Sequence, residues 1–223
     1  MSGVRRLLLV RHGITDWNRE GRFQGHLDPP LSETGQREAR LIATRLAADA
    51  DLRPERVVSS ALARASETAR IIADACGSPL ATDTRLIELG QGDWEGRTHA
   101  ELAVADSARY EAWRTGDHEP PGAETVEQAL VRISAALGDL LDGEAAEATC
   151  LVSHGGTLRL VARLLLVLDG ERSWALDVDN ASLSALSRID GGGWRVDRWN
   201  DTQHLLGRLP THVDEAEGTP LAL

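Results

Sequence analysis

The stretch that decides the fold is Leu7-Leu8-Leu9-Val10-Arg11-His12-Gly13. An apolar run that ends abruptly in polar residues and a glycine is typical of a short strand buried on both faces of a sheet. A similar pattern returns at Leu151-Val152-Ser153-His154-Gly155-Gly156. We therefore predict buried strands over residues 6–10 and 148–152, each followed by a histidine and a glycine.

Helix-like and strand-like segments alternate around these two strands. Apolar spacing and turn residues predict helices over 31–48, 61–75, 99–113, 124–141 and 156–167, strands over 57–59, 80–82, 183–189 and 194–199, and loops over 15–30, 88–96 and 116–122. The last two strands flank Asp190-Gly191-Gly192-Gly193 and form a predicted hairpin. This order predicts an α/β fold, a three-layer sandwich with a mostly parallel central sheet flanked by helices and a terminal antiparallel hairpin.

The length and composition favour one domain. A chain of 223 residues with 42% hydrophobic and 26% charged residues has the size and composition of a single globular domain. We expect that domain over 1–208, with a lid-like insertion at 97–122. Proline, glycine and acidic residues gather over 209–223, so we expect a loose C-terminal tail there.

Charge and cysteine content narrow the partners. The net charge of −11 opposes non-specific binding to nucleic acid or to an anionic membrane. No apolar run approaches the ~20 residues of a membrane span. Cys76 and Cys150 lie far apart, and the apolar start is too short for a signal peptide, so we expect a cytoplasmic protein with free thiols.

His12 and His154 are the first candidates for chemistry, because ligands of such sheets bind at the carboxyl ends of the strands. A metal site is one alternative, but no HExxH motif is present and Arg11 would repel a cation. Arginine beside histidine favours an anion, and Asn18 and Gln24 add neutral donors. We therefore expect no metal.

Arg64 is a further candidate, because it lies near the start of a predicted helix, where anions are favoured. The alternative for Arg64 is a surface ion pair with Glu67.

The motifs resemble, in order, those of the histidine phosphatase superfamily, the phosphoglycerate-mutase-like proteins. The matching blocks are Arg11 to Thr15 with Trp17-Asn18; Gly21 to Gly25 with Asp28 to Leu31 and Gly35; Ser59-Ser60 with Arg64 and Glu67 to Ala69; Glu88 with Gly92 and Trp94 to Gly96; and Ser153 to Gly156. They span Leu7 to Arg159. Ile14 departs from the family, which usually has Glu or Gln there, at a position that is not a phosphate ligand.

The resemblance implies roles for these residues. His12 would be the nucleophile that forms a phosphohistidine, and Arg11, Arg64 and His154 would surround the phosphoryl oxygens. Asn18, Gln24, Gly25 and Gly155 would bind substrate, and no metal or organic cofactor would be needed. Glu88 matches the family's acid–base residue. Glu95, seven residues later, is its rival, and we interpret Glu95 as a structural loop contact.

Three functions are compatible with these motifs. The first is a phosphomonoester phosphatase, a hydrolase acting on a small phosphorylated metabolite such as a phosphosugar or a phosphoglycerate derivative. The alternatives are a phosphoglycerate mutase and a non-catalytic phosphate-binding relative. Mutases of the family usually carry a longer and more basic insertion than residues 97–122, so hydrolysis is favoured. The partner would be the small phosphomonoester, with no nucleic acid or membrane, and a homodimer is left open.

Overall fold

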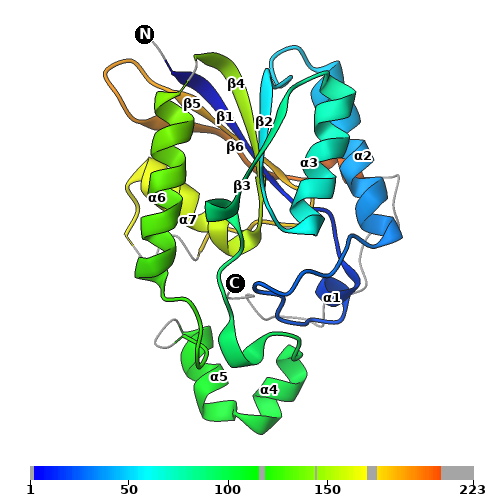
Figure 1. Ribbon diagram of the computed structural model, residues 1–223, viewed down its shortest axis with the longest axis vertical. Coiled ribbons are helices and arrows are strands. Elements are labelled where there is room, and N and C mark those ends of the chain that lie inside the picture. The colour runs from blue at the N-terminus through cyan, green and yellow to red at the C-terminus, as the bar shows by residue number, and fades with distance from the viewer. Residues whose placement is uncertain (1–2, 116–118, 144, 170–174, 207–223) are drawn as a thin grey trace.

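The computed structural model describes residues 3–115, 119–143, 145–169 and 175–206 (Figure 1). Its centre is one six-stranded sheet in the order β3-β2-β4-β1-β5-β6. The strands are β1 Val4–Arg11, β2 Arg56–Ser60, β3 Leu80–Asp83, β4 Ala146–Ser153, β5 Leu183–Arg188 and β6 Trp194–Asp201. The expected tail over 209–223 and residues 116–118 of the expected insertion lie outside the described residues.

The direction of the strands confirms the predicted sheet. β1 pairs in parallel with β4, β4 with β2, and β2 with β3. β5 pairs antiparallel with β1, and β6 antiparallel with β5. The sheet is therefore mostly parallel and closes with an antiparallel hairpin.

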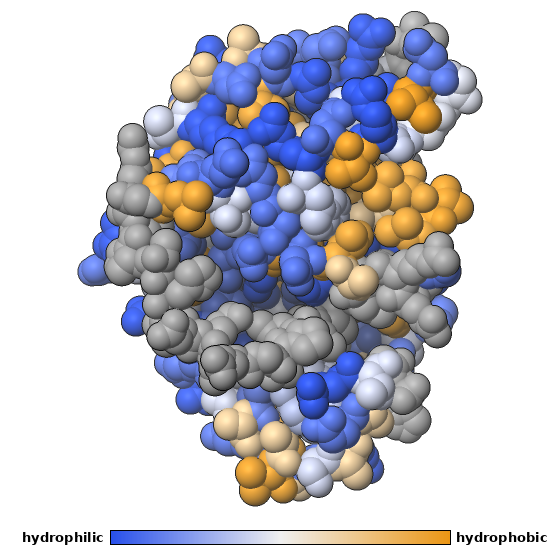
Figure 2. Space-filling model, turned by 180° about the vertical axis from the view of Figure 1, so that it is seen from behind, coloured by the Kyte–Doolittle hydropathy of each residue, from blue (hydrophilic) through white to orange (hydrophobic). Residues whose placement is uncertain are grey.

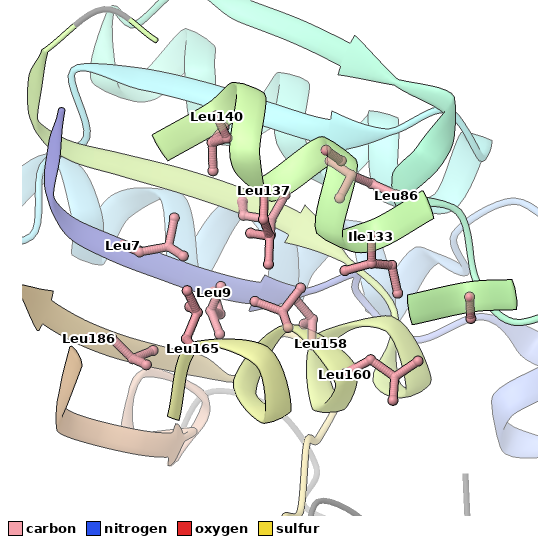
Figure 3. Close-up of a cluster of buried hydrophobic side chains, with 14 of the residues drawn as sticks. Leu7, Leu9, Leu86, Ile133, Leu137, Leu140, Leu158, Leu160, Leu165 and Leu186 are labelled. Atoms are coloured by element: carbon pink, nitrogen blue, oxygen red, sulfur yellow. The ribbon is translucent and has the colours of Figure 1, made fainter. Parts of the chain in front are cut away.

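Helices cover both faces of the sheet (Figure 1). α2 (Glu33–Ala48) and α3 (Ala63–Cys76) pack on one face, and α6 (Val126–Asp142) and α7 (Gly155–Leu166) on the other. Alternate residues of β1 serve the two faces: Leu7 and Leu9 join the α6–α7 cluster shown in Figure 3, whereas Leu8 and Val10 join the α2–α3 cluster. This double burial explains the unbroken apolar run at the start of the chain.

Local signals explain where the helices begin and end. Ser32 caps α2 by accepting from the backbone N–H of Gly35 at 3.0 Å. Thr125 and Gln128 form a capping box at the start of α6. Gly77, with φ of 67°, ends α3 in the left-handed conformation that glycine adopts without strain.

The insertion differs from its prediction. The single helix predicted over 99–113 is two helices, α4 (His99–Ala105) and α5 (Ser107–Arg114), which break at Asp106. The break lets both helices pack on one small cluster of Phe23, Trp94, Leu102, Tyr110 and Trp113. Tertiary packing therefore overrides a sequence that is compatible with one helix. In Figure 1 the two helices lie beyond the end of the sheet.

Two predicted loops also contain short helical turns. The predicted loop 15–30 contains α1 (Asp16–Arg19), which has a capping box between Thr15 and Asn18. The predicted loop 88–96 contains a 3-10 turn over Gly92–Trp94. The capping residues of α1 can be recognised in the sequence, but a helix of four residues is too short to show a periodic pattern of apolar residues.

The surface agrees with the polar composition. In Figure 2, hydrophilic residues cover most of the coloured part of the face seen from behind, and the largest group of hydrophobic residues lies at the right of the view. Within the described residues, no helix is both long enough and apolar enough to span a bilayer.

Candidate active site

The pairing of β1 with β4 brings the two predicted histidines together. Arg11 of β1 lies opposite Ser153 of β4, and the backbone N–H of His12 donates to the carbonyl of Ser153 at 3.0 Å. The two rings follow the strand ends directly, with centroids 5.2 Å apart. His12 is 2% exposed and His154 is fully buried. Two residues distant in sequence thus meet at the carboxyl ends of two central, neighbouring strands.

His12 is held in a defined tautomer. Its Nδ1 lies 2.7 Å from the carbonyl oxygen of Gly13, which can only accept, so Nδ1 carries the proton. Burial and the nearby charges of Arg64 and Arg11 hold the pKa of His12 well below its usual range. Nε2 therefore keeps its lone pair at neutral pH, as a nucleophile requires.

Gly13 is required by a close backbone approach. A Cβ on Gly13 would lie 2.4 Å from the carbonyl oxygen of Gly35, and a Cβ on Gly35 would lie 2.1 Å from that of Ile14. The loop that carries His12 therefore lies directly against the first turn of α2. The backbone N–H of Gly13 also donates to Thr68 Oγ1 at 3.2 Å, which ties this loop to α3.

His154 is anchored from the end of β2. Its Nε2 lies 2.8 Å from Ser60 Oγ. Burial, Arg64 and His12 lower the pKa of His154 well below its usual range, so this ring is also neutral. Among the described residues, its buried Nδ1 has no hydrogen-bond partner. A buried nitrogen without a partner costs free energy that a ligand oxygen would recover.

Arg64 is buried beside the histidines. It is 1% exposed, and its guanidinium donates to the carbonyls of Leu27 at 2.9 Å and Gly25 at 3.0 Å. Its ion pair is with Asp28, at 3.4 Å, whereas Glu67 accepts from Gln36. The alternative of a surface ion pair with Glu67 is therefore wrong. Burial lowers the pKa of Arg64 to about 10, which leaves it cationic at neutral pH.

Arg11 and Arg64 surround the histidines with positive charge. Arg11 donates to the carbonyl of Val178 at 2.6 Å, which fixes its guanidinium against the chain that leads into β5. The buried Nε of Arg64, like Nδ1 of His154, has no partner among the described residues. Cationic donors in a buried setting favour an anion with several oxygens.

The predicted neutral donors lie around a buried threonine. Thr15 Oγ1 lies 2.9 Å from Asn18 Oδ1 and 3.1 Å from Gln24 Oε1, so it can donate to one or the other. Gly25 follows with φ of 49°, and a Cβ there would lie 2.1 Å from Glu95 Oε1. Asn18, Gln24 and Gly25 thus lie close together, and Arg64 donates to the carbonyl of Gly25 in the same loop.

Glu88 is held beside the first turn of α7, the helix whose N-cap residue is His154. Its carboxylate accepts from the backbone N–H groups of Thr157 at 3.1 Å and Gly156 at 3.3 Å. These two bonds fix the position of the carboxyl group. Glu95 instead accepts from the backbone N–H groups of His26 and Gln91, at 2.9 and 3.0 Å, which is the loop contact predicted for it.

Two further residues of this region were missed by the sequence analysis. Arg159 of α7 is 6% exposed, and a Cβ on the predicted ligand Gly155 would lie 3.6 Å from both Arg159 Nη1 and Arg11 Cζ. Its spacing of four residues from Gly155 on one helix was a usable signal. Asn180 donates to the carbonyl of His12 at 3.0 Å, but it lies in a loop that carries no motif.

Comparison with known proteins gives a consistent family. The model of the histidine phosphatase superfamily (branch 1) matches residues 7–202. The "Probable phosphoglycerate mutase GpmB" of Enterobacter sp. (strain 638) is 36% identical over 207 residues, which cover 88% of this chain and 93% of that protein. The phosphoglycerate mutase-like protein 4 of Arabidopsis thaliana is 34% identical, over 89% of this chain and 86% of its own length.

Solved phosphatases share the fold. The mycobacterial glucosyl-3-phosphoglycerate phosphatase, in complex with VO3, superposes with a TM-score of 0.80 at 36% identity, covering 89% of this chain and all of its own. The α-ribazole phosphatase of Shigella flexneri gives a TM-score of 0.77 at 29% identity, over 88% of this chain and 96% of its own. With the family model matched over most of its length, the chain belongs to the histidine phosphatase superfamily.

Proposed function

We propose that this chain is a phosphomonoester phosphatase that forms a phosphohistidine on His12 and hydrolyses a small phosphorylated metabolite, a phosphosugar or a phosphoglycerate derivative. The observation that carries this proposal is the state of His12. Its Nδ1 proton is held by Gly13, and its ring is kept neutral beside Arg11 and Arg64. A neutral imidazole that faces cationic donors is suited to attack a phosphate ester.

In the first half-reaction, Nε2 of His12 attacks phosphorus and the bond from phosphorus to the leaving oxygen breaks. Glu88, protonated, gives its proton to that oxygen as the electron pair arrives there. Arg11, Arg64 and neutral His154 contact the phosphoryl oxygens, over which negative charge is spread in the transition state. Asn18, Gln24, Gly25 and Gly155 complete the binding of the substrate.

In the second half-reaction, water attacks the phosphohistidine. Its proton passes to the carboxylate of Glu88, which now acts as the base. The bond between phosphorus and Nε2 breaks and inorganic phosphate leaves. The bonds from the backbone N–H groups of Gly156 and Thr157 hold the same carboxyl group beside the first turn of α7 in both half-reactions.

Two observations favour hydrolysis over mutase activity. The insertion consists of two short helices, α4 and α5, held by one small cluster. A mutase must keep water from its phosphohistidine, which a larger cover would do better. Solved structures similar in fold include a glucosyl-3-phosphoglycerate phosphatase and an α-ribazole phosphatase, whereas a curated relative of similar identity is named a probable phosphoglycerate mutase. The segment 97–122 would then contact the leaving group and select the substrate.

Phosphorus NMR tests the proposal directly. Protein in EDTA would be mixed in separate tubes with 3-phosphoglycerate plus a trace of 2,3-bisphosphoglycerate, with glucosyl-3-phosphoglycerate, and with α-ribazole phosphate. Release of inorganic phosphate by the wild type, and not by His12→Ala, is the expected result. Formation of 2-phosphoglycerate without inorganic phosphate would identify a mutase. Broadened substrate signals without any product would identify a binding protein.

A further inference from the structure

The backbone just before Glu88 is held by side chains rather than by a neighbouring strand. The carbonyl of Leu86 accepts from Ser153 Oγ at 2.7 Å, and that of Ile87 from Thr157 Oγ1 at 2.7 Å. His26 Nε2 lies 3.0 Å from the carbonyl of Glu88. Consecutive carbonyls are thus fixed by residues from β4, α7 and the loop after α1.

Arg132 of α6 makes the largest number of these contacts. It donates to the carbonyls of Arg85 at 2.7 Å, Ile87 at 2.9 Å and Glu88 at 3.1 Å. The same guanidinium pairs with both carboxylate oxygens of Glu124, at 2.6 and 2.7 Å. The side chains of Arg132 and Glu124 are only 17% and 15% exposed. One planar group therefore joins three backbone carbonyls and a carboxylate.

Glu124 also binds the backbone on the other side of Glu88, at Gly90. Its carboxylate accepts from the backbone N–H of Gly90 at 3.3 Å, and its own N–H donates to the carbonyl of Gly90 at 3.0 Å. The segment from Arg85 to Gly90 is thus fixed before and after Glu88 by one ion pair. The carboxylate of Glu88 is fixed separately, from the start of α7.

We propose that Arg132, paired with Glu124, is a positioning residue that sets the place of Glu88 for proton transfer to the leaving group. This inference rests on the proposed function. A general acid works only within hydrogen-bond reach of the atom it protonates, so a small shift of the Glu88 backbone weakens it. The hydrogen bonds of Arg132 go to the backbone of Arg85 to Glu88 and to Glu124, whereas its charge also contributes to the lowered pKa of His154. A test of positioning must therefore keep a cation at this residue.

The substitution Arg132→Lys distinguishes an effect of positioning from an effect of charge. Arg132→Lys keeps a cation near Glu124 but cannot donate to three carbonyls and a carboxylate at once. We expect kcat/KM for phenyl phosphate, whose leaving group needs a proton, to fall about tenfold, and that for p-nitrophenyl phosphate to fall less than about threefold. Glu124→Gln, which keeps the contacts to the carbonyls, should show the same asymmetry to a smaller degree and serves if Arg132→Lys does not fold.

Arg56→Lys is the matched control. Arg56 donates to the carbonyl of Leu140, near the C-terminal end of α6, at 2.7 Å and to Thr149 Oγ1 at 2.9 Å, and it makes no described contact with the segment around Glu88. A purely structural role of Arg132 predicts that Arg132→Lys and Arg56→Lys lower the melting temperature alike and lower activity on both esters equally. Positioning predicts the asymmetry for Arg132→Lys alone.

A double substitution completes the test. In the Glu88→Gln background there is no acid left to position, so adding Arg132→Lys should cost no further activity. Additive losses, or equal losses on the two esters, would overturn the inference while the phosphatase reaction itself stood. A wild-type protein without His12-dependent hydrolysis of p-nitrophenyl phosphate would instead overturn the proposed function, and this inference with it.

Discussion

The sheet and the α4–α5 insertion are held together in different ways. The sheet lies between two large apolar clusters, and its central strands β1 and β4 are buried on both faces. The insertion depends on one cluster of five side chains around Phe23. Among its described residues, backbone bonds to the body include that of Phe23 N–H to the carbonyl of Arg97 at 3.0 Å and that of His99 N–H to the carbonyl of Gly21 at 2.9 Å.

The candidate reaction groups are divided unequally between these regions. His12, His154 and Glu88 lie at strand ends or beside the first turn of α7, and Arg64 in the first turn of α3. None of them belongs to α4 or α5. This difference indicates that the residues that react and the residues that select the substrate belong to separate parts of the fold. The sheet positions the reacting groups, so the sequence of the insertion can vary without moving them. Five substitutions test that separation.

The largest effect is expected at His12. His12→Ala removes the atom that would bond to phosphorus, so turnover of p-nitrophenyl phosphate should fall by about 10⁴-fold or more. The circular dichroism spectrum should stay that of the wild type, because the removed ring contributes little to either apolar cluster. A variant that keeps more than about 1% of the activity would contradict the nucleophile assignment.

A smaller effect is expected from the insertion. Trp113 is 4% exposed and packs edge-on against Phe23 and Trp94, with ring centroids 5.0 and 5.8 Å away. Trp113→Ala should loosen α5 and raise KM for a bulky phosphosugar about tenfold, with kcat for p-nitrophenyl phosphate within about twofold of the wild type.

Ile42→Ala is the control for that substitution. Ile42 is fully buried in the α2–α3 cluster, and its truncation should cost about 2–5 kcal/mol of global stability without changing KM. If Trp113→Ala lowered kcat for both substrates equally, the insertion would have to support the reacting groups themselves, and the separation of the two regions would fail.

The smallest effect concerns pH. Burial lowers the pKa of His99, in the insertion, to about 4, and burial with Arg45 lowers that of His204, beside the sheet, to about 4. The unfolded chain takes up protons on both as the pH falls below about 6.5, while the folded chain does not. The contribution of these two histidines to the free energy of unfolding is therefore fully present above pH 6.5 and is lost as the pH falls from about 6.5 to about 4.

Urea unfolding at several pH values measures this decline. His204→Gln should recover roughly 2 kcal/mol of the stability lost between pH 7.5 and 5, relative to the wild type. His99→Gln should recover a similar amount only if the insertion unfolds together with the sheet. An unchanged slope in His204→Gln would mean that this ring takes up its proton in the folded state.

Much of the fold was predictable from Leu7 to Val10 and its counterpart before His154, because double burial leaves an unbroken apolar run. The grouping of Arg11, His12, Arg64, Glu88 and His154 was also predictable, since each belongs to a short motif. The break at Asp106 was not, because the residues on both sides suit a continuous helix and only the cluster around Phe23 selects two. In the sequence, Arg132 looks like an ordinary surface charge on a predicted helix. Its ion pair with Glu124 could not be predicted, because Glu124 lies in the loop before α6 and not at helical spacing from Arg132.

The parallel pairing of β1 with β4 has a consequence for how the chain acquires its structure. The two strands lie side by side although α2, α3 and α6 all separate them along the chain. Closing so long a loop is slow, and local helices form much earlier. During synthesis Leu7 to Val10 stay unpaired on both edges until β4 has been made, and on the edge that pairs with β5 for longer. The meeting of His12 with His154 is therefore a late event, and the reactive centre exists only in chains that have completed the central pair of strands.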